Sequence, residues 1–311
     1  MRDVLGVVKP GLFTTIQDLG RPNAIASGVP PSGAMDRFAL RAANLLVGNE
    51  EGAAALECTL SGPQLVALHS CLVAIAGADF DPHINGEPAP MWTGIFLSAG
   101  DELTFVGRRS GARAYVAVAG AVAGDRWLGS VSTYMLAERG GMHGRLLAAR
   151  DVVAVAAESS APAVSGRRLD ENLRPDYADH KLRAIAGPHM KRLDAAGRQT
   201  LFGSVFRLSR DADRMGYRLE GTGLDASGDE LLSFGLVPGA IQVPRSGQPI
   251  LLMADHQTAG GYPVVATVGS ASMPVAAQLL PGDEVRFAEV SIEGALRMRA
   301  AQRVALDSLK S

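Results

Sequence analysis

The sequence is poor in cysteine, in net charge and in long apolar runs. Its two cysteines, Cys58 and Cys71, are too few for a disulfide framework and form neither a CxxC nor a zinc-binding pattern. Both lie in apolar stretches, which favours buried thiols. The 30 Lys and Arg residues against 32 Asp and Glu give a net charge of −2. Nothing in this balance attracts the chain to nucleic acid or to an anionic membrane surface.

Targeting and membrane signals are missing as well. The N-terminal stretch MRDVLGVVKPG lacks the apolar core and the small-residue cleavage site of a signal peptide. The longest apolar stretches, such as residues 114–123, are far shorter than a membrane span. These absences predict a soluble, cytoplasmic protein with neither a membrane nor a nucleic acid as partner.

Common nucleotide-binding and hydrolase motifs are also absent. There is no GxxxxGK[ST] loop, no GxGxxG between a strand and a helix, no HExxH and no GxSxG. We therefore expect neither a phosphate loop of the common kind nor a Ser-His-Asp hydrolase. No carboxylate and histidine pair has convincing ligand spacing, so no metal site is predicted.

Strand-forming sequence dominates what is present. Short β-compatible runs alternate with turns rich in Gly, Pro and Asp. Strands are predicted at residues 65–67, 71–76, 114–119, 152–156, 182–186, 205–208, 250–253 and 264–268. Residues 36–47 predict an amphipathic helix with Asp36 as its N-cap, and residues 193–201 and 292–309 are weaker candidates. The fold is predicted to be mainly β, with a few helices.

A domain boundary is predicted at residues 158–177, where Ser, Pro and charge replace apolar periodicity. It divides the chain into two β domains, residues 1–165 and 166–311. AGDELTF at residues 99–105 and PGDEVRF at residues 281–287 echo each other across this boundary. A Gly-Asp turn is common in β proteins, so the echo leaves duplication and coincidence equally open.

The first candidate site is the loop before the predicted helix. It is dense in Gly and Pro but also carries polar groups that a rigid loop can present to a ligand. These are Gln17, Asp18, Arg21, Ser32, Gly33 and Asp36. The N–H groups of residues 28–33 would face an anion or carbonyl oxygen at the helix N-terminus. A structural Ω-loop capped by Asp36 explains the same pattern equally well.

The second candidate site is the segment ADHQTAGGYP. It combines a carboxylate, an imidazole that titrates near neutral pH, an amide, a hydroxyl and two glycines that permit close approach of a ligand. Its members are Asp255, His256, Gln257, Thr258, Gly260, Gly261 and Tyr262. A hairpin turn with a solvated His256 is the alternative.

The third candidate is residues 213–218, where Arg214 and Arg218 flank Tyr217. Guanidinium groups suit carboxylates and carbonyl oxygens. Two solvated arginines are the alternative.

At these residues the chain resembles a known family. The motifs that carry the resemblance are GLFTTIQDLGRPNAIASGVPPSGAMDRFALRAANLLVGN, ALECTLSGPQL, GARAYVAVAGAV, GGMHGR, DRMGYRLEG and ADHQTAGGYPVVATV. In this order they are similar to the family called allophanate hydrolase subunit 2, or biotin-dependent carboxyltransferase, which includes the C subunit of bacterial 5-oxoprolinase. The resemblance spans nearly the whole chain.

The resemblance implies two cyclophilin-like β-barrel domains, the first of them carboxyltransferase-like. It also implies a subunit of ATP-dependent 5-oxoprolinase, which converts 5-oxo-L-proline to L-glutamate with companion subunits A and B. ATP would be bound by, or shared with, the partner subunits. The alternatives are a biotin-dependent carboxyltransferase of the urea carboxylase and allophanate pathway, with biotin as cofactor, and a non-catalytic regulator of a partner subunit.

With the 5-oxoprolinase interpretation, roles can be assigned to the three candidate sites as a hypothesis. His256, Asp255 and Arg214 are the expected catalytic residues. The residues expected to bind the small amide substrate are Gln17, Asp18, Arg21, Ser32, Gly33, Asp36, Tyr217, Arg218, Gln257, Thr258, Gly260, Gly261 and Tyr262.

Overall fold

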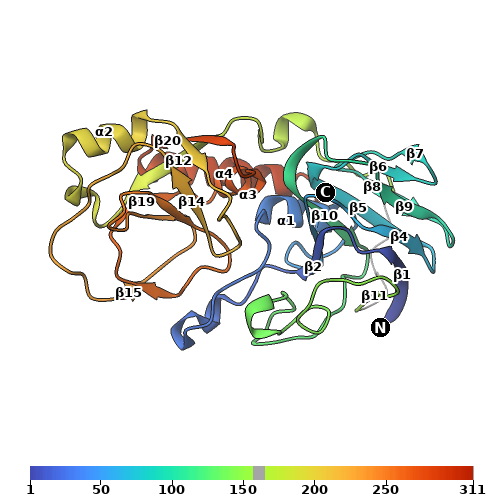
Figure 1. Ribbon diagram of the computed structural model, residues 1–311. Coiled ribbons are helices and arrows are strands. Elements are labelled where there is room, and N and C mark those ends of the chain that lie inside the picture. Colours follow the sequence, from blue (N-terminus) through green and yellow to red (C-terminus); the bar gives the residue numbers. More distant parts are fainter. Residues whose placement is uncertain (157–164, 311) are drawn as a thin grey trace. The chain divides into compact units, whose positions relative to one another are not determined.

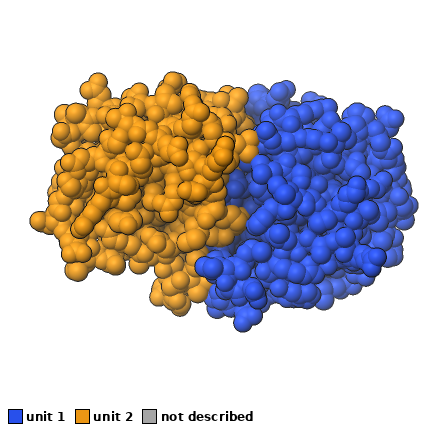
Figure 2. All heavy atoms as spheres, viewed as in Figure 1, with its two compact units in different colours: residues 1–21, 32–174, 303–311 blue, residues 22–31, 175–302 orange. Residues whose placement is uncertain are grey.

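The computed structural model describes residues 1–156 and 165–310. They form two compact units, each assembled from separated stretches of the chain (Figure 2). Unit 1 contains Met1–Arg21, Ser32–Arg174 and Arg303–Ser311, and unit 2 contains Pro22–Pro31 and Pro175–Gln302. Each unit therefore borrows a short segment from the other half of the sequence.

Unit 1 is built on two antiparallel sheets (Figure 1). The six-stranded sheet has the order β11–β1–β4–β9–β6–β7, and the five-stranded sheet has the order β2–β3–β10–β5–β8. Buried side chains of both sheets, among them Leu5, Val73 and Val116, form one apolar cluster, so the two sheets share a core. The strands are β1 (Arg2–Lys9), β2 (Phe13–Gln17), β3 (Ala55–Thr59), β4 (Gln64–Ala67), β5 (Cys71–Asp79), β6 (Pro82–Ile84), β7 (Glu87–Pro88), β8 (Gly94–Leu97), β9 (Glu102–Phe105), β10 (Ser110–Val118) and β11 (Val152–Val155).

Helix α1 (Arg37–Leu46) covers the other face of the five-stranded sheet. It begins at Asp36, whose side chain accepts a hydrogen bond from Ala39 N at 2.9 Å, which confirms the predicted N-cap. The helix packs on β5 and β10. Gly77 permits this approach, because a Cβ there would lie 2.5 Å from Arg113 O and 3.4 Å from Ala39 Cβ. Strands β5 and β10 are consequently buried on both faces, which explains their continuous apolar sequence.

Unit 2 contains a closed barrel of seven strands in the order β12–β19–β16–β17–β14–β13–β20. Parallel pairing of β12 with β20 closes it, and a two-stranded ribbon joins β15 to β18. The strands are β12 (Lys181–Ala186), β13 (Phe206–Leu208), β14 (Gly216–Glu220), β15 (Phe234–Gly235), β16 (Ala240–Gln242), β17 (Ile250–Leu252), β18 (Ala259–Gly260), β19 (Val264–Val268) and β20 (Glu284–Glu289).

Three further α-helices and four short 3-10 helices complete the described chain. The α-helices are α2 (Ala195–Gly203), α3 (Met273–Gln278) and α4 (Ile292–Asp307). The 3-10 helices are η1 (Pro22–Ser27), η2 (Met135–Ala137), η3 (Glu171–Leu173) and η4 (Met190–Arg192).

The mainly β composition is confirmed, and each of the eight predicted strands coincides with an observed one. The closed barrel predicted for the second half is confirmed too. The prediction of a second barrel is wrong, because the sheets described in unit 1 are open. They need no closure to be buried, since each sheet covers one face of the other and α1 covers the remaining face of the five-stranded sheet. Edge strand β7 is only two residues long and ends in Pro88, which has no N–H to extend the sheet.

The echoed Gly-Asp segments fold into the same turn. Gly100 N donates to Ala67 O at 2.7 Å, and Gly282 N donates to Leu208 O at the same distance. In both turns the following aspartate accepts a hydrogen bond from the backbone N three residues earlier, at 2.7 Å for Asp101 and 2.8 Å for Asp283. Both glycines have a positive φ, +94° and +95°.

A third copy of this turn occurs at residues 148–151 of unit 1. Arg150, with φ +74°, occupies the glycine position and donates from its backbone N to Val7 O at 2.8 Å. Asp151 accepts from Ala148 N at 2.7 Å. Because the turn also recurs within one unit, it is a local device that any strand pair can use, and the echo does not require a duplication.

The predicted boundary at residues 158–177 lies partly outside the described residues. Of its described portion, residues 165–174 belong to unit 1 and residues 175–177 to unit 2. Gly166 N donates to Gly94 O at 2.9 Å, and Gly94 N donates to Arg167 O at 2.8 Å. These bonds attach the segment to β8.

Cys58 and Cys71 are both buried, which confirms the prediction from their apolar surroundings. Burial raises the pKa of the Cys58 thiol to about 12 and that of Cys71 to about 11. Both thiols therefore stay protonated and unreactive near neutral pH.

Candidate functional site

Asp18, at the end of β2, organises a buried polar cluster in unit 1. Its carboxylate accepts hydrogen bonds from Ser130 Oγ at 2.6 Å, Ser132 Oγ at 2.5 Å and Val131 N at 2.8 Å. A fourth hydrogen bond, from Gly20 N at 2.7 Å, closes the turn after β2. All of these acceptor positions serve the protein itself, so this carboxylate acts as a scaffold that fixes residues 130–132.

Arg21 lies beside this cluster and is only 2% exposed. Its Nη2 donates to Ser132 O, and its guanidinium lies 5.0 Å from the centroid of the Trp127 ring. Trp127 in turn stacks on Tyr134 at 6.2 Å with an interplanar angle of 5°. The guanidinium is therefore oriented by a cation–π contact and a backbone carbonyl.

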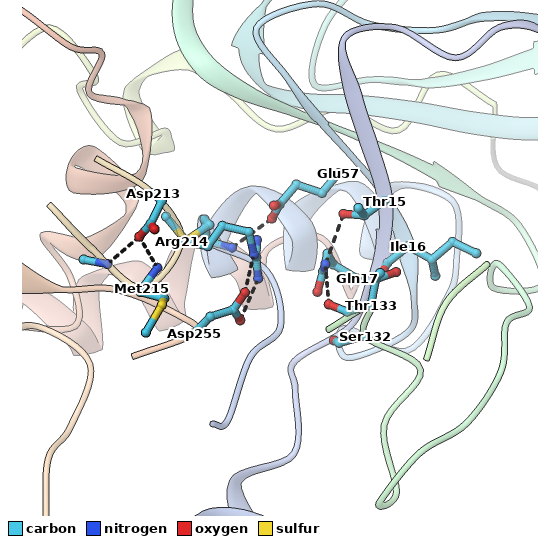
Figure 3. Close-up of polar contacts among 12 residues, drawn as sticks. Thr15, Ile16, Gln17, Glu57, Ser132, Thr133, Asp213, Arg214, Met215 and Asp255 are labelled. Carbon is cyan, nitrogen blue, oxygen red and sulfur yellow. Dashed lines mark hydrogen bonds and ion pairs between the residues drawn. The ribbon is translucent and has the colours of Figure 1, made fainter. Parts of the chain in front are cut away.

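Gln17 is 1% exposed, and its side-chain nitrogen donates to Thr15 Oγ1 at 3.1 Å and to Thr133 O at 3.2 Å (Figure 3). Among the described residues, its Oε1 has no hydrogen-bond partner. The Ser32 hydroxyl, 2% exposed on a backbone with φ +53°, likewise lacks a partner in the described chain. Buried polar atoms of this kind are costly unless something binds them.

Gly33 and Asp36 shape the entry to α1. A Cβ at Gly33, where φ is +90°, would lie 2.7 Å from Gly20 N, so only glycine permits this contact between the two turns. The Asp36 carboxylate caps α1 at Ala39 N, while its backbone N donates to Tyr115 Oη at 2.8 Å. The Asp36 carboxylate thus supplies the negative charge that stabilises the N-terminus of α1.

Unit 2 brings together the second and third predicted sites. Arg214 precedes β14 and Asp255 follows β17, and these strands pair antiparallel, so two residues 41 positions apart become neighbours. Arg214 Nε donates to Asp255 Oδ2 at 2.8 Å and Nη2 donates to Oδ1 at 3.2 Å (Figure 3). Asp255 N also donates to Arg214 O at 2.8 Å. With side chains only 13% and 10% exposed, this is a buried, bidentate ion pair.

His256 follows directly and is fully buried. Its Nδ1 lies 2.7 Å from Gln257 O, a backbone acceptor, so Nδ1 carries the proton and Nε2 presents a lone pair. Within the part of the chain that the structure describes, Nε2 has no partner. Burial lowers the pKa of His256, while the Gln257 carbonyl and the Asp255 charge oppose that shift. The imidazole is therefore neutral at pH 7 and its Nε2 is a hydrogen-bond acceptor or base.

The other predicted residues of unit 2 are spread between core and surface. Tyr217 is 2% exposed and belongs to the barrel core, whereas Arg218, its neighbour on β14, points outward. Arg218 lines an open groove of about 560 Å³ together with Arg210, Asp211, Ala212 and Asp213. Tyr217 and Arg218 therefore lie on opposite faces of one strand.

The rest of ADHQTAGGYP leaves the barrel as a ribbon. Thr258 O accepts a hydrogen bond from Leu236 N at 2.9 Å, and Gly260 pairs with Phe234. Gln257 and Gly261 are exposed, and Tyr262 is 47% exposed. The predicted hairpin-like character of this segment is thus present beside a buried, rather than solvated, His256.

Comparison with known proteins identifies the fold and its relatives. Residues 27–289 match the family described as "Carboxyltransferase domain, subdomain A and B". The chain belongs to this family. It is 38% identical to the C subunit of 5-oxoprolinase from Escherichia coli (strain K12) and covers 96% of both chains. It is 33% identical to the corresponding Haemophilus influenzae protein, over 95% of this chain and 94% of the other.

Among solved structures, this carboxyltransferase-domain chain is similar to the K. lactis urea amidolyase. The TM-score is 0.92 at 28% sequence identity, over 99% of this chain but only 20% of the other. The chain thus corresponds to about a fifth of that protein and to nearly the full length of the bacterial subunits.

Sequence reasoning missed several buried polar members of this carboxyltransferase-domain protein. Tyr115 donates to Glu57 Oε2 at 2.7 Å, and Met35 N donates to the same oxygen at 2.9 Å. Burial and the nearby Glu57 charge raise the pKa of Tyr115 well above its usual value, so it remains a neutral donor. The sequence signal that could have pointed to this cluster was Glu57, a carboxylate within the apolar run ALECTL. Ser130, Ser132 and Gln242 were missed as well, and no local pattern distinguishes them.

Metal and membrane signals can be stated for the described ranges. No three His, Cys, Asp or Glu side chains in residues 1–156 and 165–310 gather closely enough to hold a metal ion. Among the described helices, none combines the length and the apolar character that crossing a bilayer requires.

Proposed function

We propose that this chain is a subunit of an ATP-dependent 5-oxoprolinase that opens 5-oxo-L-proline to L-glutamate together with companion subunits A and B. The observation that carries the proposal is the degree of sequence identity. The chain is 38% identical to the C subunit of E. coli 5-oxoprolinase, of which it covers 96%, and 31% identical to a urea amidolyase, of which it covers 18%. The higher identity favours the activity named for the bacterial subunit.

The reaction breaks one amide bond of a lactam ring. Water supplies an oxygen to the ring carbonyl carbon, and the ring nitrogen leaves with a proton as the amine of glutamate. Amide resonance makes this carbonyl a poor electrophile, so hydrolysis of ATP to ADP and phosphate drives the step. ATP would be bound by the partner subunits or shared with them.

His256 suits the proton transfers of this reaction. Its Nε2 lone pair would accept a proton from the attacking water and return it to the leaving ring nitrogen. The hydrogen bond from Nδ1 to Gln257 O fixes the tautomer that this role needs. The lowered pKa keeps the base unprotonated at neutral pH.

Arg214 and Asp255 act as a pair in this proposal. Both carboxylate oxygens of Asp255 are bonded to Arg214, so Asp255 is a positioning residue and His256 is the proton-transfer group. Arg214 holds the Asp255 carboxylate in a fixed orientation, and the charge of that carboxylate acts on the imidazole, where charge develops during the reaction. In unit 1, Gln17 Oε1 and the Ser32 hydroxyl belong to predicted substrate-binding residues and have no hydrogen-bond partner in the described chain, so they would be able to bind the substrate.

A biotin-dependent carboxyltransferase is the second candidate. The TM-score of 0.92 with a urea amidolyase favours it. In that reaction the same donors would polarise the ureido oxygen of carboxybiotin.

Reconstitution with cognate subunits A and B separates these functions. We expect ATP-dependent glutamate release from 5-oxoproline that requires all three subunits and is unaffected by avidin. Inhibition by avidin, which sequesters biotin, would point to the carboxyltransferase. Full activity without this chain would point to a regulator instead.

The site within the assembled enzyme is tested by His256→Gln. We expect turnover to fall about 100-fold or more, a magnitude common for a lost acid–base group. His143→Gln is the matched control, because the His143 side chain is 71% exposed and pairs at the surface with Asp125. Equal turnover of the two variants would remove His256 from the mechanism.

A further inference from the structure

Gln242 is a buried amide that the reaction described above does not use. It ends β16 inside the barrel sheet, paired with Ile250 on one side and Val264 on the other, and is 1% exposed. The β16–β19 register shifts between Ile241 and Gln242, which marks a bulge at this position. Among residues 1–156 and 165–310, its side-chain nitrogen has no hydrogen-bond acceptor. An amide donor buried in this state is suited to a ligand acceptor.

Gly260 shows where this amide points. A Cβ placed on Gly260 would lie 3.4 Å from Gln242 Nε2 and 2.9 Å from Gln257 Nε2. The two amide nitrogens therefore both lie within 3.4 Å of one point beside Gly260. The third neighbour of that point is an apolar group, Leu236 Cδ1, at 3.0 Å.

We propose that Gln242 and Gln257 form a two-amide clamp over Gly260 that binds the planar amide group of a small lactam substrate. The clamp rests on the proposed function for the identity of the lactam. Its donors are N–H groups directed at the ring carbonyl oxygen. Gln242, absent from the sequence-predicted site, becomes a residue that selects substrates carrying this carbonyl.

The surroundings favour a neutral ligand group. Phe234 pairs with Gly260 across the ribbon and contacts the His189 ring at 5.0 Å. His189 Nδ1 accepts a hydrogen bond from Val264 N at 3.1 Å, and burial lowers the pKa of this imidazole, so it too is neutral. Neutral amides and a neutral ring suit a lactam carbonyl better than a phosphate, for which arginine or lysine would be expected.

The clamp is linked to the base. Gln257 contributes its side-chain nitrogen to the clamp and its backbone oxygen to His256 Nδ1 at 2.7 Å. A ligand carbonyl bound by the Gln257 side chain would therefore contact the same residue whose backbone oxygen orients the imidazole. Gln257 would therefore take part both in substrate selection and in orienting the base.

The test is a titration of the full chain, labelled with ¹⁵N-glutamine, followed by NMR of the side-chain NH₂ signals. 5-Oxoproline and 2-pyrrolidinone carry the ring amide, whereas L-proline lacks the ring carbonyl. We expect saturable downfield shifts of the Gln242 and Gln257 signals with both lactams and none with proline. Gln242→Leu should raise the half-saturation concentration about 10-fold or more, the order expected for one lost hydrogen bond.

Two further variants keep the test independent of folding. Gln257→Leu changes an exposed side chain and should weaken lactam binding to a similar extent. Gly260→Ala should displace the Gln257 amide and weaken binding. Gly235→Ala, on the paired strand, is the control, because a Cβ there meets no atom of the described chain within 4 Å.

With the wild-type chain, two outcomes would overturn the clamp: no saturable shift at Gln242 with either lactam, or equal shifts with proline. Failure of the proposed function can be distinguished from failure of the clamp. If the assembled subunits release no glutamate while 2-pyrrolidinone still shifts Gln242, the clamp stands and its substrate is another small amide. If glutamate is released and Gln242→Leu leaves both KM and the titration unchanged, the clamp is wrong and the function stands.

Discussion

Asp18 of unit 1 differs from His256 and Gln242 of unit 2 in how completely the hydrogen bonds of its buried side-chain atoms are satisfied. In unit 1, the Asp18 carboxylate receives four hydrogen bonds from the segments around it. In unit 2, His256 Nε2 and Gln242 Nε2 are as deeply buried, yet the described chain offers neither a partner. A saturated network stabilises a fold, whereas unsatisfied atoms in otherwise well-packed surroundings indicate where a ligand belongs. Burial alone does not separate scaffold from site; hydrogen-bond saturation does.

The largest expected effect is on stability, at Asp18. Asp18→Ala leaves two buried serine hydroxyls, the buried Val131 N–H and the half-buried Gly20 N–H without their acceptor, so we expect the free energy of unfolding to fall by about 3–5 kcal/mol. Denaturant titration of the purified chain measures this. Asp125→Ala, which removes a carboxylate that is 56% exposed, should change it by no more than about 0.5 kcal/mol. Similar losses for the two variants would contradict a scaffold role for Asp18.

A smaller effect is expected at His256, and it depends on pH. The folded-state pKa of His256 lies below its unfolded value of about 6.5, so the unfolded chain binds a proton that the folded chain does not. The contribution of the neutral, buried imidazole to the free energy of unfolding is fully present above pH 6.5. It is lost as pH falls toward the folded-state pKa, by at most about 1.4 kcal/mol per pH unit. Melting temperatures from pH 8 to pH 5 should therefore fall less steeply for His256→Gln than for the wild type. Parallel curves would mean that His256 is not a neutral, buried base.

The smallest effect sharpens the comparison through the turn that both units share. Arg150 adopts φ +74° where Gly282 adopts φ +95° in the equivalent turn of unit 2. Arg150→Gly should raise the free energy of unfolding by about 0.5–1 kcal/mol, because glycine reaches this conformation without steric cost. Gly282→Ala should lower it by a similar amount, since no described atom within 4 Å would contact the added methyl group. Melting temperatures of both variants measure these changes, and an unchanged or lowered value for Arg150→Gly would contradict the shared turn.

Local sequence correctly predicted several elements of the fold. Asp36 as an N-cap and the amphipathic pattern after it were sufficient to place α1, because capping and periodicity are local. Strands β1 to β3 and the short helix α3 were not predicted, although they are regular in the structure. The open sheets of unit 1 were missed because closure depends on which elements cover which face, and that is set by packing between distant strands.

The candidate site was predicted residue by residue but not as an arrangement. His256, Asp255 and Arg214 were singled out for their chemistry, yet the bidentate pair between residues 41 positions apart follows only from the β14–β17 pairing. Asp18 looked like a ligand-binding group until its partners, 112 to 114 positions away, were located. Gln242 lies between apolar neighbours, and only its unmet hydrogen bond distinguishes it from a core residue.

The end of helix α4 constrains when unit 1 can be completed. Arg303 Nη1 donates to Glu51 Oε2 at 2.7 Å, Lys310 lies 3.8 Å from the same carboxylate oxygen, and Leu306 and Leu309 are buried. The ribosome makes these residues after all of Pro175–Gln302, the main segment of unit 2. During synthesis, unit 1 therefore lacks its last segment, with the buried Leu306 and Leu309, until all of Pro175–Gln302 has been made.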